Sequence, residues 1–254
     1  MRTFIINLRE NTQRREDMIA QCSALGIEHE IFPAIKGSQL TEEEKKKHSS
    51  PINLLNNPGE MGCALSHLFI YKKMIDENIA MALILEDDAL LGEETPDVLA
   101  FLEKEKINQP TATLLTPVST YIDNEKTDVD HSHAIYNALS ATRTHGYVIN
   151  NKGAHALYNF LYPVWSVADH WFIFKEYDII NLRGLIPHCI HLSTFAESSD
   201  IGDERFTTEN INKNRIKKRI IRSTFPIKLK IKRRINKLFY RYIKKSRIKS
   251  YSTE

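Results

Sequence analysis

The first 90 residues alternate short apolar runs with amphipathic stretches, and this alternation restricts the fold more than any other feature. Runs at 3–8, 29–35 and 79–85 have the length of buried strands. Helical patterns at 11–27 and 56–78 lie between them. Unbroken apolar strands joined by helices are typical of a sheet that is covered on both faces. We therefore predict an α/β domain with a central, mostly parallel sheet.

Further along the chain the pattern continues with more interruptions. Residues 41–50, TEEEKKKHSS, are typical of a solvated helix. Residues 111–118 predict a strand, and residues 144–161 predict a strand followed by a turn and a helix. Residues 196–210 are polar and predict a loop.

The charges are segregated between the two ends of the chain. Residues 211–254 contain 17 Lys and Arg against one acid, a balance of +16, so residues 1–210 carry −13 of the net +3. We therefore divide the chain into a body, 1–210, and a basic tail, 211–254. A strongly basic segment favours anionic partners.

Within the tail, Ile231, Ile235, Leu238 and Tyr242 recur at helical spacing, with Lys and Arg between them. Ser223 or Thr224 would cap this helix, with Pro226 in its first turn. This composition predicts an amphipathic helix that lies on an anionic membrane surface. Two alternatives are a helix packed on the body and, less favoured because no nucleic-acid-binding module accompanies it, a nucleic-acid contact.

The three cysteines are scattered, which indicates a reducing compartment without a disulfide framework. The first residues lack the apolar core of a signal peptide, and the longest apolar run, 79–85, is too short to span a bilayer. We expect a cytoplasmic protein that touches a membrane surface through its tail.

The apolar run at 79–85 leads directly into three acids, Glu86, Asp87 and Asp88. Ligands of open α/β sheets bind beyond the carboxyl ends of the strands. In an extended chain Glu86 and Asp88 would point to one side and Asp87 to the other. Two convergent carboxylates form half of a site for a hard divalent cation, which a diphosphate can complete. The alternative is an acidic loop that caps the following helix.

A second candidate segment is PGEMGCALSH, which starts a helix. Gly59 and Gly62 allow close backbone approach, and free N–H groups at a helix start favour a phosphate. The segment also carries three polar side chains of possible function: Glu60, Ser66 and His67. Read alone, it is equally a helix start with Cys63 and Leu65 in the core and His67 in a structural role.

Four segments in order, INLRENTQRRE, GEMGCALSH, ALILEDDA and THGYVINNKGAHAL, resemble glycosyltransferase family 25, which includes bacterial lipooligosaccharide galactosyl- and glucosyltransferases. The resemblance extends from about Phe4 to about Ile201. It implies a GT-A-like fold, a UDP-sugar donor (UDP-galactose), a lipooligosaccharide acceptor, Mn²⁺ or Mg²⁺, and an inverting transfer of the β-1,4-galactosyltransferase type.

The resemblance also implies roles for residues on the donor side. Glu86-Asp87-Asp88 stands where GT-A enzymes have Asp-X-Asp, and the Glu at the first position makes Asp88 the safer metal ligand. Glu86 would ligate the metal or hold the ribose. A late histidine, His191 or alternatively His188, would complete the metal shell. Donor contacts are expected at Asn7, Arg14, Arg15, Gly59, Glu60, Ser66, His67, Glu86 and Asp87. For both arginines the alternative is a solvated first helical turn.

Inverting transfer needs a base for the acceptor hydroxyl. In WSVADHWFIF we expect Asp169 as this base, assisted by His170, with Trp165 and Trp171 stacked on sugar rings. Gly146 and Tyr147 would shape the acceptor side. The alternatives are that Asp169 caps a helix and that both tryptophans lie in the core. For Gly146 and Tyr147 the alternative is that they belong to a buried strand.

We therefore predict a metal-dependent hexosyltransferase. One alternative is a nucleotidyltransferase, which needs the same acids and a diphosphate. Another is a membrane- or nucleic-acid-associated binding protein that works through its basic tail.

Overall fold

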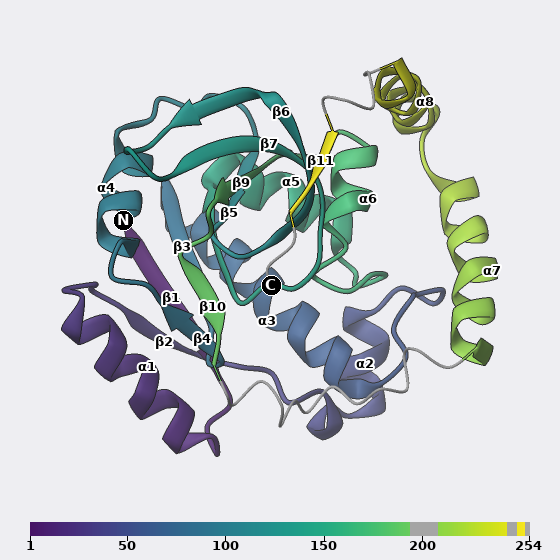
Figure 1. Ribbon diagram of the computed structural model, residues 1–254. Helices are drawn as coiled ribbons and strands as arrows, with labels where there is room; N and C mark the ends of the chain where they lie inside the picture. Colours follow the sequence, from purple (N-terminus) through teal and green to yellow (C-terminus); the bar gives the residue numbers. More distant parts are fainter. Residues whose placement is uncertain (194–207, 243–247, 252–254) are drawn as a thin grey trace.

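The computed structural model of the chain describes residues 1–193, 208–242 and 248–251 (Figure 1). Its helices are α1 (Thr12–Ala24), the 3-10 helix η1 (Gly37–Gln39), α2 (Glu42–His48), α3 (Pro58–Asp76), α4 (Thr95–Lys104), α5 (Asn151–Leu161), α6 (Trp171–Glu176), α7 (Thr208–Thr224) and α8 (Ile227–Tyr242). Its strands are β1 (Arg2–Asn7), β2 (Glu30–Pro33), β3 (Met81–Glu86), β4 (Ala89–Leu91), β5 (Thr111–Leu114), β6 (Val118–Asp128), β7 (Ala134–Ala141), β8 (Gly146–Asn150), β9 (Asn181–Ile186), β10 (Ile190–Leu192) and β11 (Ile248–Ser250).

Nine of these strands form one mixed sheet in the order β11-β6-β7-β9-β5-β8-β3-β1-β2. Only the pairs β1–β2, β1–β3 and β5–β9 are parallel, whereas the other five pairs are antiparallel. The α/β prediction is confirmed, but the sheet is less parallel than expected because β8 runs antiparallel between β3 and β5. Strands β4 and β10 form a separate antiparallel pair.

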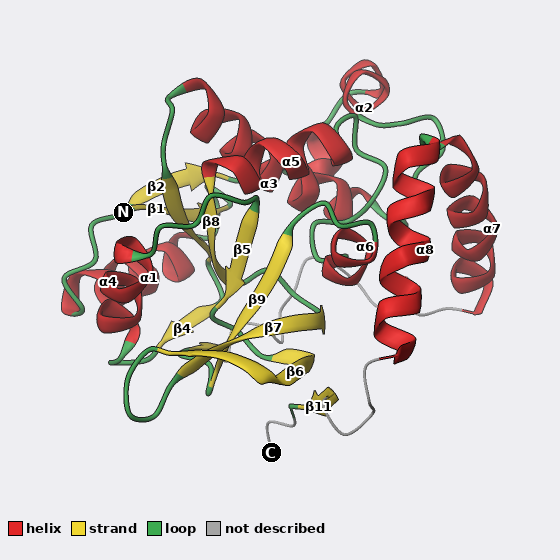
Figure 2. Ribbon diagram, turned by 90° about the horizontal axis from the view of Figure 1, so that it is seen from above, coloured by secondary structure: helices red, strands yellow, loops and turns green. Residues whose placement is uncertain are grey.

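Each face of the sheet is covered by its own helices (Figure 2). Phe4 and Ile84 point into the cluster that α3, α5 and α6 cover, whereas Ile5 and Leu83 point into the cluster that α1 and α4 cover. This is the alternation expected of strands buried on both faces. Both clusters therefore hold β1 and β3 rigidly, and the acids follow the end of β3.

The predicted N-terminal elements are present. In α1, Met18 and Cys22 are buried, and Gly26 follows the helix with φ of 65°, a conformation that favours glycine. Helix α2 has no buried residue, and a capping box of Thr41 and Glu44 starts it. Strand β5, strand β8 and helix α5 occupy the segments predicted for them.

The hairpin of β6 and β7 was not predicted. After Ile122 the rest of β6 is exposed and polar, and its pairing with β7 contains register shifts. Period-two hydrophobicity is therefore absent from its sequence, and pairing with β7 holds the strand in place.

The basic tail contains two helices, and α8 begins directly after Pro226. The end of α7 and the residue after it pack on the body. Ile221 is buried in the cluster that α3, α5 and α6 cover, and the Phe225 ring contacts Trp165. In α8, Arg233 forms an ion pair of 2.9 Å with Glu176. The loop predicted at 196–210 lies outside the described residues except for its last three, which start α7.

Candidate functional site

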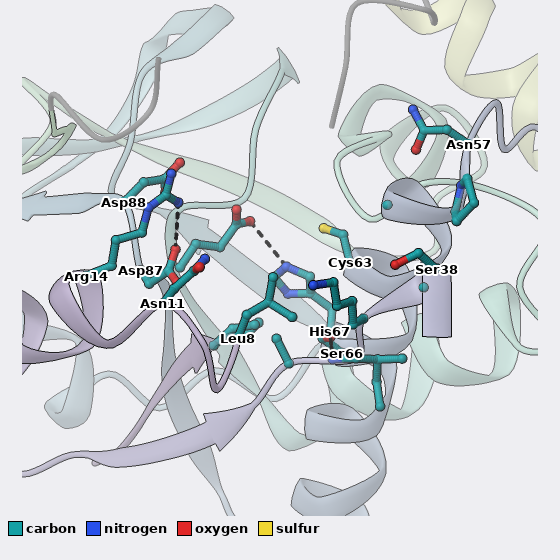
Figure 3. Close-up of a pocket in the computed structure, with 18 residues that line it drawn as sticks. Leu8, Asn11, Arg14, Ser38, Asn57, Cys63, Ser66, His67, Asp87 and Asp88 are labelled. Atoms are coloured by element: carbon teal, nitrogen blue, oxygen red, sulfur yellow. Dashed lines mark hydrogen bonds and ion pairs between the residues drawn. The ribbon is translucent and has the colours of Figure 1, made fainter. Parts of the chain in front are cut away.

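A cavity of about 540 Å³ opens where β1, β2 and β3 end (Figure 3). Parallel strands bring these ends to one edge of the sheet, which is where α/β folds bind ligands. The lining residues are Ile6, Leu8, Asn11, Arg14, Ala34, Ile35, Lys36, Gly37, Ser38, Asn57, Pro58, Gly59, Cys63, Ser66, His67, Glu86, Asp87 and Asp88. Both candidate segments of the sequence thus meet in one place.

All three acids line this cavity. The prediction that Asp87 would point away from Glu86 and Asp88 assumed an extended chain. Strand β3 ends at Glu86, and Asp87 and Asp88 form a turn into β4, so alternation no longer separates them. The turn concentrates three carboxylates at one end of the cavity.

Asp87 is held by two partners from the N-terminal segment. Asn7 Nδ2 donates to Asp87 Oδ2 at 2.7 Å, and Arg14 Nη1 donates to Asp87 Oδ1 at 3.1 Å. Burial raises the pKa of Asp87, and the contacts with Asn7 and Arg14 oppose that rise. Asn7 is buried and does not line the cavity, so the structure assigns it the positioning of Asp87, not the expected direct donor contact. Arg15 Nη1 donates to the carbonyl of Arg9, and it does not line the cavity either.

Glu86 is held by contacts from α3 and from the segment before β8. Its Oε1 accepts from Thr144 Oγ1 and lies 3.3 Å from His67 Nε2. Burial acts to raise the pKa of Glu86, but the contacts with His67 and Thr144 outweigh it and leave the pKa lowered. Behind His67, Nδ1 lies 2.8 Å from the Tyr147 hydroxyl, which lies 2.7 Å from that of Tyr71. His67 is therefore fixed between an acid and a buried pair of hydroxyls.

Asp88 differs from its neighbours because Arg14 only partly offsets the factors that raise its pKa. Its Oδ1 is buried, and among the described residues it has no hydrogen-bond partner. Burial and the negative charges of Glu86 and Asp87 raise the pKa of Asp88 to about 7. A buried carboxylate oxygen in this situation is stabilised by a cation. The observation fits the predicted role of Asp88 as a metal ligand.

The start of α3 forms another wall of the cavity. Asn57 Oδ1 caps the helix by accepting from Glu60 N at 2.9 Å, and Gly59 lines the cavity. Glu60 itself is buried, and its carboxylate accepts from Asn56 N at 2.6 Å. The expected donor contact of Glu60 is therefore wrong: this side chain is used to hold the loop before α3.

The segment after β2 packs tightly on the first turns of α3. A Cβ at Gly62 would lie 2.2 Å from the carbonyl oxygen of Ile35, so glycine is required at this position. Ser66 Oγ accepts from Ile35 N at 2.8 Å and donates to the carbonyl of Gly62 at 2.7 Å. Ser66 thus lines the cavity, but its hydroxyl already joins the two backbone segments.

The residues expected on the acceptor side are mostly in the core. Trp171 is fully buried, with its ring edge-on to that of Tyr147, and its Nε1 donates to the carbonyl of Arg143 at 2.8 Å. Trp165 is 8% exposed and donates to the carbonyl of Phe160. The prediction that either indole stacks on a sugar is therefore wrong.

Gly146 and Tyr147 also have internal roles. A Cβ at Gly146 would lie 2.7 Å from the Ile190 side chain, so this glycine permits close packing of β10. Tyr147 is fully buried and contacts His67 from within the core. Neither residue meets an acceptor directly.

Asp169 and His170 lie just before α6. Asp169 is half-buried, and its Oδ2 accepts from Arg143 N at 3.4 Å. It does not line the cavity, but its charge contributes to raising the pKa of Cys63, after burial and Glu86. Burial lowers the pKa of His170 to about 4, and its Nδ1 lies 2.5 Å from Ser166 Oγ. The imidazole is therefore neutral at pH 7.

His191 lies in β10, beside the acidic turn. Ser193, directly after β10, donates its N–H to the carbonyl of Asp88 at 2.8 Å. The His191 ring, however, is exposed and contacts His188 at 3.1 Å. Among the described residues, the group of three ligand atoms within 4.8 Å of one another is Cys63, His67 and Glu86. The predicted set of Glu86, Asp88 and His191 is not brought together in this way.

Three parts of the site were missed from the sequence. Residues 34–38 form a wall of the cavity, and their position after β2, a parallel neighbour of β1, was a usable signal. Cys63 is half-buried and lines the cavity, whereas the helical pattern of its segment favoured a position in the core. Thr144 contacts Glu86 across 58 residues of sequence, and no local pattern indicates this contact.

Comparison with known proteins points to one family. Residues 1–172 match the model of glycosyltransferase family 25, described as an LPS biosynthesis protein. A glycosyltransferase 25 family member of Aedes aegypti is 34% identical over 34% of this chain and 16% of its own. The lipooligosaccharide biosynthesis protein lic2B of Haemophilus influenzae is 34% identical over 38% of this chain and 37% of its own. A procollagen galactosyltransferase 1-A of Xenopus laevis is 31% identical over 34% of this chain and 15% of its own.

The matched segments therefore span well under half the length of each of these relatives. The family model, in contrast, spans β1 to the start of α6 and includes the whole cavity. The chain belongs to glycosyltransferase family 25.

Proposed function

We propose that the chain is an inverting, GT-A-like hexosyltransferase that moves galactose from UDP-galactose to a sugar of a lipooligosaccharide. The observation that carries the proposal is Asp88 Oδ1, a buried carboxylate oxygen without a hydrogen-bond partner among the described residues, in the cavity at the strand ends. Family membership supports sugar transfer. The named galactosyltransferase and lipooligosaccharide relatives support the choice of sugar and acceptor.

In this proposal Asp88 is the first ligand of a Mn²⁺ or Mg²⁺ ion, with Glu86 next to it. Held there, the ion would supply positive charge that favours the departure of UDP. Arg14 and Lys36 line the same cavity and add cationic side chains near the phosphates. Asp87 holds Arg14 in this position through their 3.1 Å contact.

The proposed base is Asp169. Its carboxylate takes the proton of the acceptor hydroxyl as that oxygen attacks the sugar carbon. The side chain is half-buried, and its charge acts on Cys63 in the cavity wall, so the two lie in the same part of the molecule. His170 is proposed to orient the hydroxyl as a neutral imidazole.

The test of this function is product release across a panel of nucleotide sugars with lactose- or glucose-terminated acceptors. UDP released from UDP-galactose only in the presence of Mn²⁺ or Mg²⁺ and acceptor supports the proposal. Release of pyrophosphate would instead indicate the nucleotidyltransferase alternative. No UDP release from any nucleotide sugar would contradict the proposed transfer.

We further propose that α8 attaches the enzyme to an anionic membrane surface, where a lipid-linked acceptor is found. In the described ranges no helix is both long and apolar enough to cross a bilayer. One face of α8, however, exposes large apolar side chains by 50% or more: Ile227, Ile231, Ile235, Leu238, Phe239 and Tyr242. Lys228, Lys230, Lys232, Arg234 and Lys237 are interspersed with them.

The body contacts the other face of α8. Asn236 donates to the carbonyls of Lys175 and Glu176, and Arg233 pairs with Glu176. By helical periodicity these contacts lie opposite the stripe of Ile227, Ile231 and Ile235. The exposed stripe is therefore not explained by packing on the described body, and its basic flanks favour anionic lipid.

A further inference from the structure

We propose that Cys63, His67 and Glu86 form a binding site for Zn²⁺, separate in its chemistry from the Mn²⁺ or Mg²⁺ position proposed at Asp88. Their ligand atoms lie within 4.8 Å of one another. Cys63 and His67 are four residues apart, on one face of α3, and Glu86 ends β3 opposite them. Figure 3 shows the Cys63 sulfur and the His67 ring facing the same part of the cavity.

The distances fit a tetrahedral ion. Ligand atoms at about 2.0–2.3 Å from tetrahedral zinc lie roughly 3.4–3.6 Å from one another. The His67 Nε2 to Glu86 Oε1 distance is 3.3 Å, close to that value. The sulfur of Cys63, which is half-buried and lines the cavity, lies within 4.8 Å of both of these atoms. Because all three residues line the cavity, a ligand atom from the cavity would complete the coordination shell.

The contacts around His67 are also those of a metal ligand. Ligating histidines usually donate their second ring N–H to an oxygen, which fixes the ring. His67 Nδ1 lies 2.8 Å from the Tyr147 hydroxyl, which lies 2.7 Å from that of Tyr71. Without a metal, Nε2–H donates to Glu86 and Nδ1 accepts from Tyr147. With Zn²⁺ on Nε2, the proton moves to Nδ1 and is donated to Tyr147, whose hydroxyl then donates to Tyr71.

The ligand types select the metal. Thiolate and imidazole favour Zn²⁺, whereas Mn²⁺ and Mg²⁺ favour the oxygens of Asp88 and a diphosphate. Coordination replaces the Cys63 S–H bond by an S–Zn bond, and the released proton goes to solvent. Because the three ligands line the cavity proposed for the sugar nucleotide, bound Zn²⁺ would compete with it. This last consequence alone rests on the proposed function.

The test is a titration of the full chain with Zn²⁺ and, separately, with Co²⁺, without nucleotide or Mn²⁺. We expect one tight site, release of the thiol proton, and a thiolate-to-cobalt charge-transfer absorption. Cys63→Ala should remove the absorption and lower zinc affinity by more than the roughly 10- to 100-fold that loss of an outer contact costs. Tyr147→Phe should lower the affinity by about 10- to 100-fold while keeping the absorption.

Cys22→Ala is the matched control, since Cys22 is buried in α1; it should keep both the affinity and the absorption. Circular dichroism shows whether each variant is folded. A thiolate absorption that persists in Cys63→Ala, or its absence from the wild type, would overturn the site. Binding of UDP with Mn²⁺ is measured separately, so failure of the zinc site leaves the donor proposal intact, and the reverse also holds.

Discussion

The acidic turn after β3 and the exposed face of α8 are the two regions where side chains lack the partners that folding usually gives them. At the turn, a buried Asp88 oxygen has no hydrogen-bond partner among the described residues. On α8, apolar side chains such as Ile231 and Ile235 stay 50–59% exposed. The first region needs positive charge, and the second needs an apolar surface. The comparison indicates that each region is completed by a different ligand.

The largest expected effect is at the turn. Asp88→Asn should weaken Mn²⁺-dependent UDP binding by at least about 100-fold, because loss of a charged ligand costs several kcal/mol and each 1.4 kcal/mol is tenfold. Isothermal titration calorimetry measures this change. Asp76→Asn, at an exposed acid of α3, is the control and should bind as the wild type does. Equal affinity in Asp88→Asn would remove Asp88 from the metal site.

The second prediction concerns α8. The double substitution Ile231→Glu with Ile235→Glu should reduce binding to anionic vesicles by roughly 10- to 100-fold, because it removes buried apolar area and adds repelled charges. Co-sedimentation with vesicles measures this change. UDP affinity should not change, because neither residue approaches the cavity.

Ile19→Glu provides the control for this pair, since Ile19 is a 36% exposed isoleucine on α1. The Ile19→Glu substitution should leave the binding to anionic vesicles unchanged. If the double variant binds vesicles as well as the wild type does, the membrane role of α8 is wrong.

The third prediction is a pH dependence that belongs to the turn alone. The pKa of Asp88 is about 7 in the folded protein, above its usual value of 3.8. Between these values the folded state binds more protons than the unfolded state, so the free energy of unfolding falls as pH rises from about 4 to 7. Asp88→Asn lacks this contribution.

Chemical denaturation in the absence of divalent cations, at a series of pH values, measures this difference. The wild type should lose stability relative to Asp88→Asn as pH rises. A constant difference between the two proteins from pH 4 to 8 would show that Asp88 has an ordinary pKa.

The smallest expected effect separates the two regions by salt. Exposed charges are screened, with a Debye length of about 10 Å at 0.1 M salt, whereas buried charges are screened much less. Raising the salt from 0.05 to about 0.5 M should weaken vesicle binding several-fold, because α8 contributes exposed lysines and arginines. The Mn²⁺-dependent UDP affinity should change less. Equal salt sensitivity would contradict the distinction between a buried and an exposed site.

The sequence predicted the parts of the molecule whose signals are local. Strands β1 and β3 are continuous apolar runs, and their parallel ends brought the acids and the α3 segment to one expected edge. The hairpin of β6 was missed because its exposed polar residues carry no period-two signal. The parallel character of the sheet was overestimated because strand direction depends on connections that hydrophobicity does not encode.

The outcomes for the site residues follow the same distinction between local and long-range signals. Asp88 and Arg14, two of the predicted donor-side residues, both line the cavity, because one follows β3 and the other lies in the first turn of α1. Trp171 was expected to stack on a sugar ring and Tyr147 to shape the acceptor side, yet packing buries both. Thr144 could not be found, since only the folded sheet brings it to Glu86. Long-range pairing is the information that residue patterns lacked.

The most direct test of the donor site is a crystal of the full chain grown with UDP and Mn²⁺, with the manganese located by its anomalous scattering. We expect one manganese peak bonded to the Asp88 carboxylate and to oxygens of both phosphoryl groups, in the cavity lined by Arg14 and Lys36. A nucleotide bound in another part of the molecule, or one bound in this cavity with no manganese at Asp88, would contradict the account.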